Sequence, residues 1–256
     1  MSLAAPEAVA GHRRQALREA ERLIGHDFAN PDLLAEALTH RSALGLLKQG
    51  RRRARRMAAP RNFERLEFLG DRVLGLVVAD RLWRRFEHEP EGDLTRRHAQ
   101  LVRRETLAAV AAEIGLDRVI RMSPAEAAAG GTRSPAVLAD ALEAVIAAVY
   151  LDAGLDAGFA AAFALVERLW GPRIAAMAAP PRDPKTVLQE WAQGRGLPLP
   201  HYELVATSGP DHDRRFTIAV KVEGSEEASA TASSKRAAET AAAAALLERL
   251  NGASHG

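Results

Sequence analysis

The sequence of 256 residues contains no cysteine. This absence excludes disulfide bonds and metal sites built from thiolates, and it is compatible with a reducing cytoplasm. The segment from Met1 to Arg14 has no hydrophobic stretch of the kind found in secretory signals. A run of about eighteen uncharged apolar residues, the length needed to cross a membrane, is also lacking. We therefore expect a cytoplasmic protein that has no membrane partner.

The chain also lacks a strong excess of charge of either sign. Its formal net charge is +2, so nucleic-acid binding cannot be inferred from the overall charge and depends on where the charged residues lie. Hydrophobic residues make up 47% of the chain, which is enough for a packed core. The length allows one or two domains.

One segment, residues 48–61, is strongly basic. It carries seven Lys and Arg residues and no acid. Like charges in one block repel each other and stay solvated, which favours a loop. Two interpretations remain open: the loop could contact phosphate groups near a catalytic site, or it could be an exposed insertion without a function.

The segment 62–78 combines apolar residues at helical spacing with three acids. The apolar positions cover most of the helix, which predicts a helix inside a core. Glu64, Glu67 and Asp71 follow one another at i, i+3 and i+7, within about 60° of arc. Burial of like charges is unfavourable unless a cation lies among them, and a divalent metal ion is the simplest such cation. The alternative is a solvated polar stripe, with the acids paired to neighbouring arginines: Arg61, Arg65 and Arg72.

A second helix with the same character is predicted at residues 137–150. It is almost wholly apolar and is interrupted by Asp140 and Glu143, at i and i+3. Two core helices that each carry acids on one face can cross so that the carboxylates converge. A cluster of oxygen ligands suits Mg²⁺ or Mn²⁺. Pairs of such ions activate water and stabilise the leaving oxygen in phosphodiester cleavage.

Three segments together resemble the bacterial ribonuclease III family: residues 64–71 (ERLEFLGD), 91–93 (EGD) and 138–144 (LADALEA). The first is a specific signature, and the resemblance extends from about Leu23 to Leu250. It implies an all-helical endonuclease domain that forms a homodimer and cleaves double-stranded RNA with Mg²⁺, for which Mn²⁺ can substitute.

The resemblance also implies a role for each acid. The metal ligands are Glu67, Asp71, Asp140 and Glu143, of which Asp71 and Glu143 are the catalytic residues. Two accessory acids lie at the edge of the site: Glu64 and Glu91. Without the resemblance, Glu91 is a solvated loop acid of no special note.

The implied reaction is hydrolysis of phosphodiester bonds to 5′-phosphate and 3′-hydroxyl ends with short 3′ overhangs. The implied substrates are precursors of ribosomal RNA and some messenger RNAs. An alternative from another class is a duplex-RNA-binding protein without catalytic activity. The presence of all six acids favours the enzyme.

Three further details of the helical domain are predicted from local signals. Asp93 is expected as the N-cap of the helix after the turn at residues 89–95. Gly171 and Pro172 are expected to end a helix that starts near Leu155. His40 has no second histidine at ligand spacing, so we expect a structural role for it.

The pattern changes after a Pro-containing segment at residues 178–182. Helices are predicted at 185–193 and 235–250, and three strands at 202–207, 216–222 and 227–231. This order resembles a double-stranded RNA-binding domain, as do residues 183–190 (DPKTVLQE), His212 and residues 234–239 (SKRAAE). The expected fold is multi-domain: an all-α endonuclease domain at 15–177, a linker at 178–182 and a small α+β (α-β-β-β-α) double-stranded RNA-binding domain at 183–251.

Such a domain recognises the shape of an RNA duplex across two minor grooves. The resemblance implies that the groove contacts are Thr186, Gln189 and Glu190 in one groove and His212 in the next. It implies that Ser234, Lys235 and Arg236 contact the phosphates in between. Residues 183–250 contain eight Lys and Arg against ten Asp and Glu, a net charge of −2. Ala230 and Ala232 also stand shortly before the basic helix start, where the family commonly has glycine. We therefore expect modest affinity for isolated duplex RNA, offset by dimerisation and by the arginine-rich loop.

Overall fold

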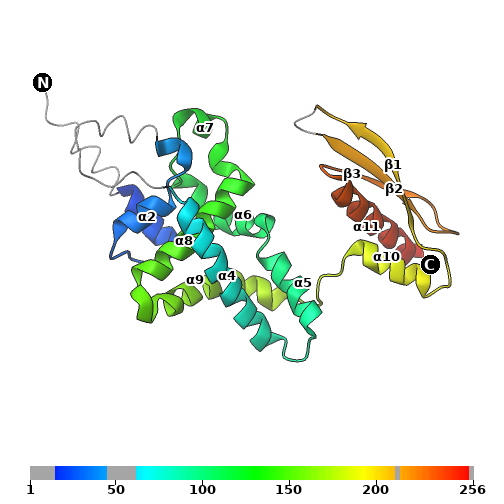
Figure 1. Cartoon of the computed structure of the whole chain (residues 1–256), viewed down its shortest axis with the longest axis horizontal. Coiled ribbons are helices and arrows are strands. Elements are labelled where there is room, and N and C mark those ends of the chain that lie inside the picture. Colours follow the sequence, from blue (N-terminus) through cyan, green and yellow to red (C-terminus); the bar gives the residue numbers. More distant parts are fainter. Residues whose placement is uncertain (1–14, 45–61, 211–213, 254–256) are drawn as a thin grey trace, which may run out of the picture. The chain divides into compact units, whose positions relative to one another are not determined.

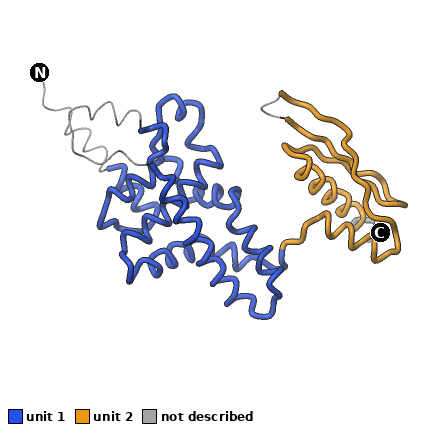
Figure 2. Tube along the Cα trace, viewed as in Figure 1, with its two compact units in different colours: residues 1–180 blue, residues 181–256 orange. Residues whose placement is uncertain are grey.

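The computed structural model describes residues 15–44, 62–210 and 214–253 (Figure 1). The chain divides into two compact units, residues 1–180 and 181–256 (Figure 2). The division falls inside the predicted linker, residues 178–182. Two predicted features lie outside the described residues: the basic segment at 48–61 and His212.

The described part of the first unit is helical, which confirms the predicted all-α domain. Residues 15–24 form a helix, and three 3₁₀ turns occur at Arg41–Ala43, Leu116–Arg118 and Gly131–Arg133. The other helices are α2 (Pro31–Ala37), α4 (Glu64–Arg85), α5 (Glu91–Leu101), α6 (Arg104–Glu113), α7 (Pro124–Ala128), α8 (Pro135–Asp152) and α9 (Gly154–Ala176). Among the described helices of the whole chain, none has the length and apolar character to cross a membrane.

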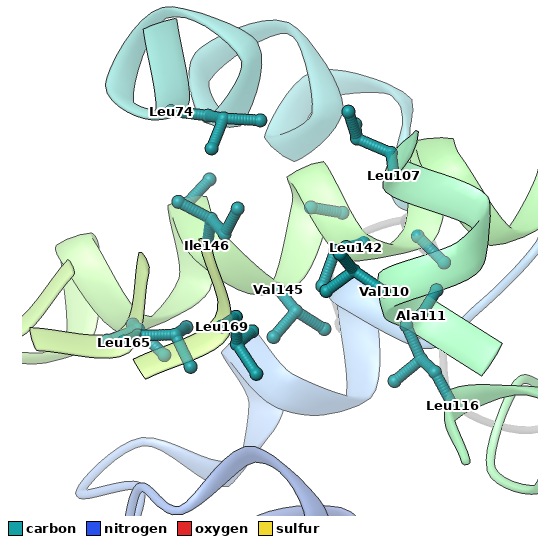
Figure 3. Close-up of a cluster of buried hydrophobic side chains, with 14 of the residues drawn as sticks. Leu74, Leu107, Val110, Ala111, Leu116, Leu142, Val145, Ile146, Leu165 and Leu169 are labelled. Atoms are coloured by element: carbon teal, nitrogen blue, oxygen red, sulfur yellow. The ribbon is translucent and has the colours of Figure 1, made fainter. Parts of the chain in front are cut away.

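Helix α8 lies at the centre of this unit and packs against α2, α4, α6 and α9. From Leu138 to Val149 every residue of α8 is buried except Asp140 and Glu143. Figure 3 shows α8 side chains in one apolar cluster with side chains of α4, α6 and α9. Burial of each large aliphatic side chain stabilises the fold by about 1.5–3 kcal/mol, so this cluster fixes the position and rotation of α8. The two acids occupy the part of its surface that the cluster leaves open.

Helix α4 is longer than predicted, and it is buried along one side instead of all round. Leu66 and Val77 face the core, but Phe68 is 65% exposed, Leu76 58% exposed and Trp83 73% exposed. The prediction of a helix inside a core holds for one side of α4 only, because periodicity cannot separate a core face from an apolar face that a single chain leaves uncovered. Three large exposed side chains on one helix mark a surface suited to a partner.

The N-terminus of α5 differs from the prediction. The helix starts at Glu91 with Pro90 as its N-cap, so Asp93 lies in the first turn and forms an ion pair with Arg96. The extended backbone of Pro90 takes the capping position, and its carbonyl accepts hydrogen bonds from the N–H groups of Asp93 and Leu94. The helix therefore begins three residues earlier than the side-chain signal indicated.

Helix α9 does not end at Gly171 and Pro172 but continues to Ala176. A proline inside a helix lacks the N–H that would bond to the carbonyl four residues earlier. Tertiary contacts on both sides of it preserve the helix: Trp170 is fully buried and its indole Nε1 donates to the carbonyl of Leu101 at 3.0 Å, and Ile174 is buried one turn later. Packing here outweighs the local signal for a helix end.

The second unit confirms the predicted α-β-β-β-α order. Three antiparallel strands, β1 (His201–Ser208), β2 (Arg215–Lys221) and β3 (Ala228–Ala232), lie in that order in the sheet. Each strand end lies one residue from its predicted position. Helix α11 (Lys235–Ala253) packs on β2 and β3, and helix α10 (Pro184–Gln193) packs on α11. The core is formed by small and aliphatic residues, including Leu188, Val220, Ala242 and Leu246.

A buried ion pair fixes the connection between α4 and α5. Arg97 is fully buried, and its guanidinium donates to both carboxylate oxygens of Glu89 at 2.6 and 2.7 Å. The guanidinium also lies 3.7 Å from the ring centroid of Phe86. This two-fold hydrogen bond lowers the pKa of Glu89. It holds the loop that leads to Glu91.

We expect Arg97→Ala to lower the free energy of unfolding of the helical unit by about 3 kcal/mol, because it opens a cavity and leaves a carboxylate without its partner. Urea denaturation followed by circular dichroism measures the change. The matched control is Arg84→Ala, which removes an exposed pair with Asp80 and leaves the midpoint unchanged. Equal effects of the two substitutions would show that the buried pair has no special role.

Candidate metal centre

The two acid-bearing helices touch through their backbones at one point. A Cβ atom placed on Gly70 of α4 would lie 1.8 Å from the carbonyl oxygen of Glu143 on α8. Any side chain at position 70 would therefore force the helices apart. Glu67 lies one turn before Gly70, and Asp140 lies one turn before Glu143. The close crossing thus brings acids of both helices to the same place.

Three carboxyl groups meet at this crossing. One ligand oxygen each of Glu67, Asp140 and Glu143 lies within 4.8 Å of the others. All three side chains are partly buried, and none forms an ion pair within 4 Å with a basic side chain among the residues described. The structure therefore brings together three of the four acids that the sequence predicts as metal ligands.

The electrostatics of the group follow from burial and like charge. Burial is the largest cause of a raised pKa at each of the three carboxyls. For Glu143 the pKa rises to about 7, and the neighbouring charges of Glu67 and Asp140 add to the effect. A carboxyl group in such a place needs either a proton or a cation close by. Because hard divalent ions prefer carboxylate oxygens, the three residues fit such an ion.

Asp71 lies on the same helix one turn after Glu67, but it is not a member of the three-acid group. It forms an ion pair with Arg72, whose guanidinium also lies 4.8 Å from the ring centroid of Phe68. The side chain of Asp71 is 45% exposed. Asp71 therefore has the geometry of the alternative interpretation given for this helix, in which a solvated acid pairs with a neighbouring arginine.

The two predicted accessory acids are not members of the three-acid group. Glu64 is exposed one turn before Glu67, and its charge contributes to the raised pKa of Glu67. Glu91 is exposed at the first position of α5, where its carboxylate accepts a hydrogen bond from Thr95 Oγ1 at 2.7 Å.

Two basic residues near the acids were not predicted from the sequence as part of the site. His40 caps the 3₁₀ turn Arg41–Ala43, where its Nδ1 accepts from the N–H of Ser42, in keeping with its expected structural role. Its charge also lowers the pKa of Asp140. Arg104, the first residue of α6, partly offsets the rise in pKa at all three clustered acids through its positive charge. No sequence spacing relates either residue to α4 or α8, so only the folded chain reveals them.

In the second unit, two predicted groups of RNA contacts lie on α10 and at the start of α11. Thr186, Gln189 and Glu190 are exposed at i, i+3 and i+4 on α10, and Glu190 pairs with Arg182. Lys235 and Arg236 are exposed in the first turn of α11.

The starts of these two helices are joined. Ser234 caps α11, since its Oγ accepts a hydrogen bond from the N–H of Ala237. Lys185 Nζ of α10 donates to Glu239 of α11 at 2.5 Å. Pro184, Ser234 and Arg236 line one shared groove. The starts of α10 and α11 therefore lie side by side.

Comparisons with known proteins agree on both units. Residues 30–169 match the family model described as Ribonuclease-III-like, and residues 184–250 match the Double-stranded RNA binding motif. The chain is 53% identical over 234 residues to Ribonuclease 3 of Cereibacter sphaeroides (strain ATCC 17025 / ATH 2.4.3), covering 91% of this chain and 95% of the relative. It is 52% identical over 227 residues to Ribonuclease 3 of Dinoroseobacter shibae, covering 89% and 92%. A solved nuclease domain of ribonuclease III from Campylobacter jejuni aligns with a TM-score of 0.49 and 37% identity, covering 60% of this chain and 97% of that chain.

We expect Gly70→Ala to destabilise the helical unit by about 1–3 kcal/mol, because the new methyl group overlaps the α8 backbone. Thermal unfolding measures the loss. Gly75→Ala is the matched control on the same helix, since its Cβ would lie 3.7 Å from the nearest atom, His98 Nε2. That variant gains helix propensity without a clash. Equal stability of the two variants would rule out a backbone contact at Gly70.

Proposed function

The chain belongs to the ribonuclease III family, and we propose that the acids at the crossing of α4 and α8 form the metal-dependent catalytic centre of a double-stranded RNA endoribonuclease. The observation that carries this assignment is the convergence of Glu67, Asp140 and Glu143 within 4.8 Å. A duplex-binding protein without activity has no need of three clustered acids on core helices that form no ion pair within the described part of the chain. The family relation and this geometry both favour the enzyme over the non-catalytic alternative.

The family and the acidic group together support a requirement for a divalent metal ion. We propose Mg²⁺ as the ion, with Mn²⁺ as a substitute, held by Glu67, Asp140 and Glu143 together with Asp71. When bound, the ion supplies a more acidic water as nucleophile and positive charge for the oxygens of the phosphate.

The side chains of the site have separable roles in this proposal. Asp71 and Glu143 are the proposed catalytic residues, and Asp71 joins the ligands when it leaves Arg72. Glu143 exchanges a proton near neutral pH in the metal-free chain, so metal binding at this residue is coupled to proton release. Glu64 and Glu91 are proposed to guide the ion or water from the outside of the site.

The proposed RNA contacts belong to the second unit. The exposed face of α10 with Thr186, Gln189 and Glu190 suits a minor groove, with His212 assigned to the next groove. Ser234, Lys235 and Arg236 suit the phosphates between the grooves. Two exposed cations at a helix start are slightly unfavourable by themselves, and a phosphate partner removes that cost.

A homodimer through the catalytic domain is part of the proposal. The exposed apolar residues of α4, Phe68, Leu76 and Trp83, offer a surface for a second copy of the chain. Two centres per dimer would each cut one strand, leaving 5′-phosphate and 3′-hydroxyl ends with short 3′ overhangs. Processing of ribosomal RNA precursors and messenger RNA in the cytoplasm is the proposed cellular role.

We expect Glu143→Gln to abolish Mg²⁺-dependent cleavage of labelled duplex RNA and to leave duplex binding close to wild type, since the proposed RNA contacts lie in the other unit.

In EDTA the wild type loses stability as the pH rises from about 5 to about 8, because folding raises the pKa of Glu143 from 4.5 to about 7. The variant lacks this titration, so at pH 8 its Tm lies above that of the metal-free wild type.

The same variant should no longer gain stability from Mn²⁺, whereas wild type does. Glu87→Gln, which changes an exposed acid in the turn after α4, is the control for loss of one negative charge. Cleavage by Glu143→Gln at the wild-type rate, or joint loss of cleavage and duplex binding, would contradict the separation of roles.

We expect the double substitution Lys235→Gln and Arg236→Gln to weaken duplex binding and to reduce the slope of log K against log salt by about two. Filter binding at several salt concentrations measures the slope. The control is Arg195→Gln with Lys221→Gln, which removes two exposed charges elsewhere in the second unit. If both double substitutions reduced the slope equally, the effect would come from net charge and not from contacts of Lys235 and Arg236 with phosphate.

A further inference from the structure

Arg104 stands beside the acidic group because of the way α6 packs. Leu107, one turn after Arg104, is 1% exposed and belongs to the cluster that contains Leu142 of α8 (Figure 3). Leu142 is the neighbour of Glu143 in the sequence. Helices α6 and α8 are in direct contact, so the first turn of α6 lies next to the acid-bearing part of α8.

The charge of Arg104 acts on the group as a whole. It lowers the pKa of Glu67, Asp140 and Glu143, whereas Arg72 acts on Glu143 and His40 on Asp140. Yet the Arg104 side chain is exposed, and its guanidinium forms no ion pair within 4 Å with any carboxylate in the described part of the chain. Arg104 is therefore close to the acids without being their partner.

This separation argues against simple neutralisation. An arginine that served to balance the acids would form a two-fold hydrogen bond with one of them, as Arg97 does with Glu89. A guanidinium that stops short of contact leaves its five donors available to another anion. A solvated arginine at a helix start would also be slightly unfavourable, since the helix dipole is positive at that end.

The anion that enters this site is RNA phosphate. Three carboxylates by themselves repel it, and a planar guanidinium binds phosphate oxygens through two parallel hydrogen bonds. We propose that Arg104 binds the phosphate at the cleavage site and stabilises the charge that develops on its oxygens during hydrolysis. This inference rests on the proposed function and adds a substrate-binding cation to it.

The proposal has two consequences of opposite sign. Arg104→Gln removes a phosphate contact, so kcat/KM for duplex cleavage should fall by about 10- to 100-fold. The same substitution removes a positive charge that opposes cations, so Mn²⁺ should bind about threefold more tightly. A structural role would instead weaken Mn²⁺ binding together with cleavage.

The experiment measures duplex cleavage, Mn²⁺ affinity by electron paramagnetic resonance and Tm for the full chain and three variants. Arg104→Lys keeps the charge and should retain wild-type Mn²⁺ affinity and regain part of the cleavage. Arg118→Gln removes an exposed arginine of the same unit and should change none of the three measurements. Slower cleavage with tighter Mn²⁺ binding and unchanged Tm for Arg104→Gln supports the proposal.

Other outcomes overturn it. Cleavage by Arg104→Gln at the wild-type rate would show that Arg104 has no role in the reaction. Weaker Mn²⁺ binding together with a lower Tm would show that its role is structural. Failure of the wild type to bind Mn²⁺ or to cleave duplex RNA would overturn the proposed function itself. The wild-type measurements therefore separate the two failures.

Discussion

The contact between the backbones of α4 and α8 is the constraint on which the site depends. Because Gly70 has no side chain, the α8 carbonyl at Glu143 can approach α4 directly. At that separation, acids one turn from the contact reach each other across the two helices. The apolar cluster around α8 prevents the helix from rotating or sliding, so its two acids stay at the crossing. Packing energy thus holds together charges that repel.

The repulsion among the clustered carboxyl groups destabilises the fold, but it also favours the binding of a cation. Carboxyls that burial pushes toward the neutral form bind a proton or a cation more readily than solvated acids do. A hard ion held by these carboxylates would offset this electrostatic cost and stabilise the fold. Such local strain at a site, offset by a strong core elsewhere, is a common balance in enzymes.

Much of the fold could be predicted from the sequence because its periodicities are strong. The acid helices, the α-β-β-β-α order and the strand bounds all follow from local pattern and turn residues. The failures arise where tertiary contacts outweigh a local signal. Pro172 does not end α9 because Trp170 and Ile174 hold the helix on both sides, and Phe68 is exposed because one chain does not supply its cover.

The limits for the site have the same physical origin. Acid spacing left both a metal cluster and acid–arginine pairs open, and it could not decide that Asp71 pairs with Arg72 or show that Arg104 comes from a third helix. Cations such as Arg104 matter because much of the surface that meets RNA phosphate is not positively charged. The acidic centre repels phosphate, and residues 183–250 carry a net charge of −2, so the second unit does not attract RNA through its overall charge. In the proposed mechanism, binding and cleavage depend on a few cations at defined positions, and these residues distinguish a working centre from a group of partly buried acids.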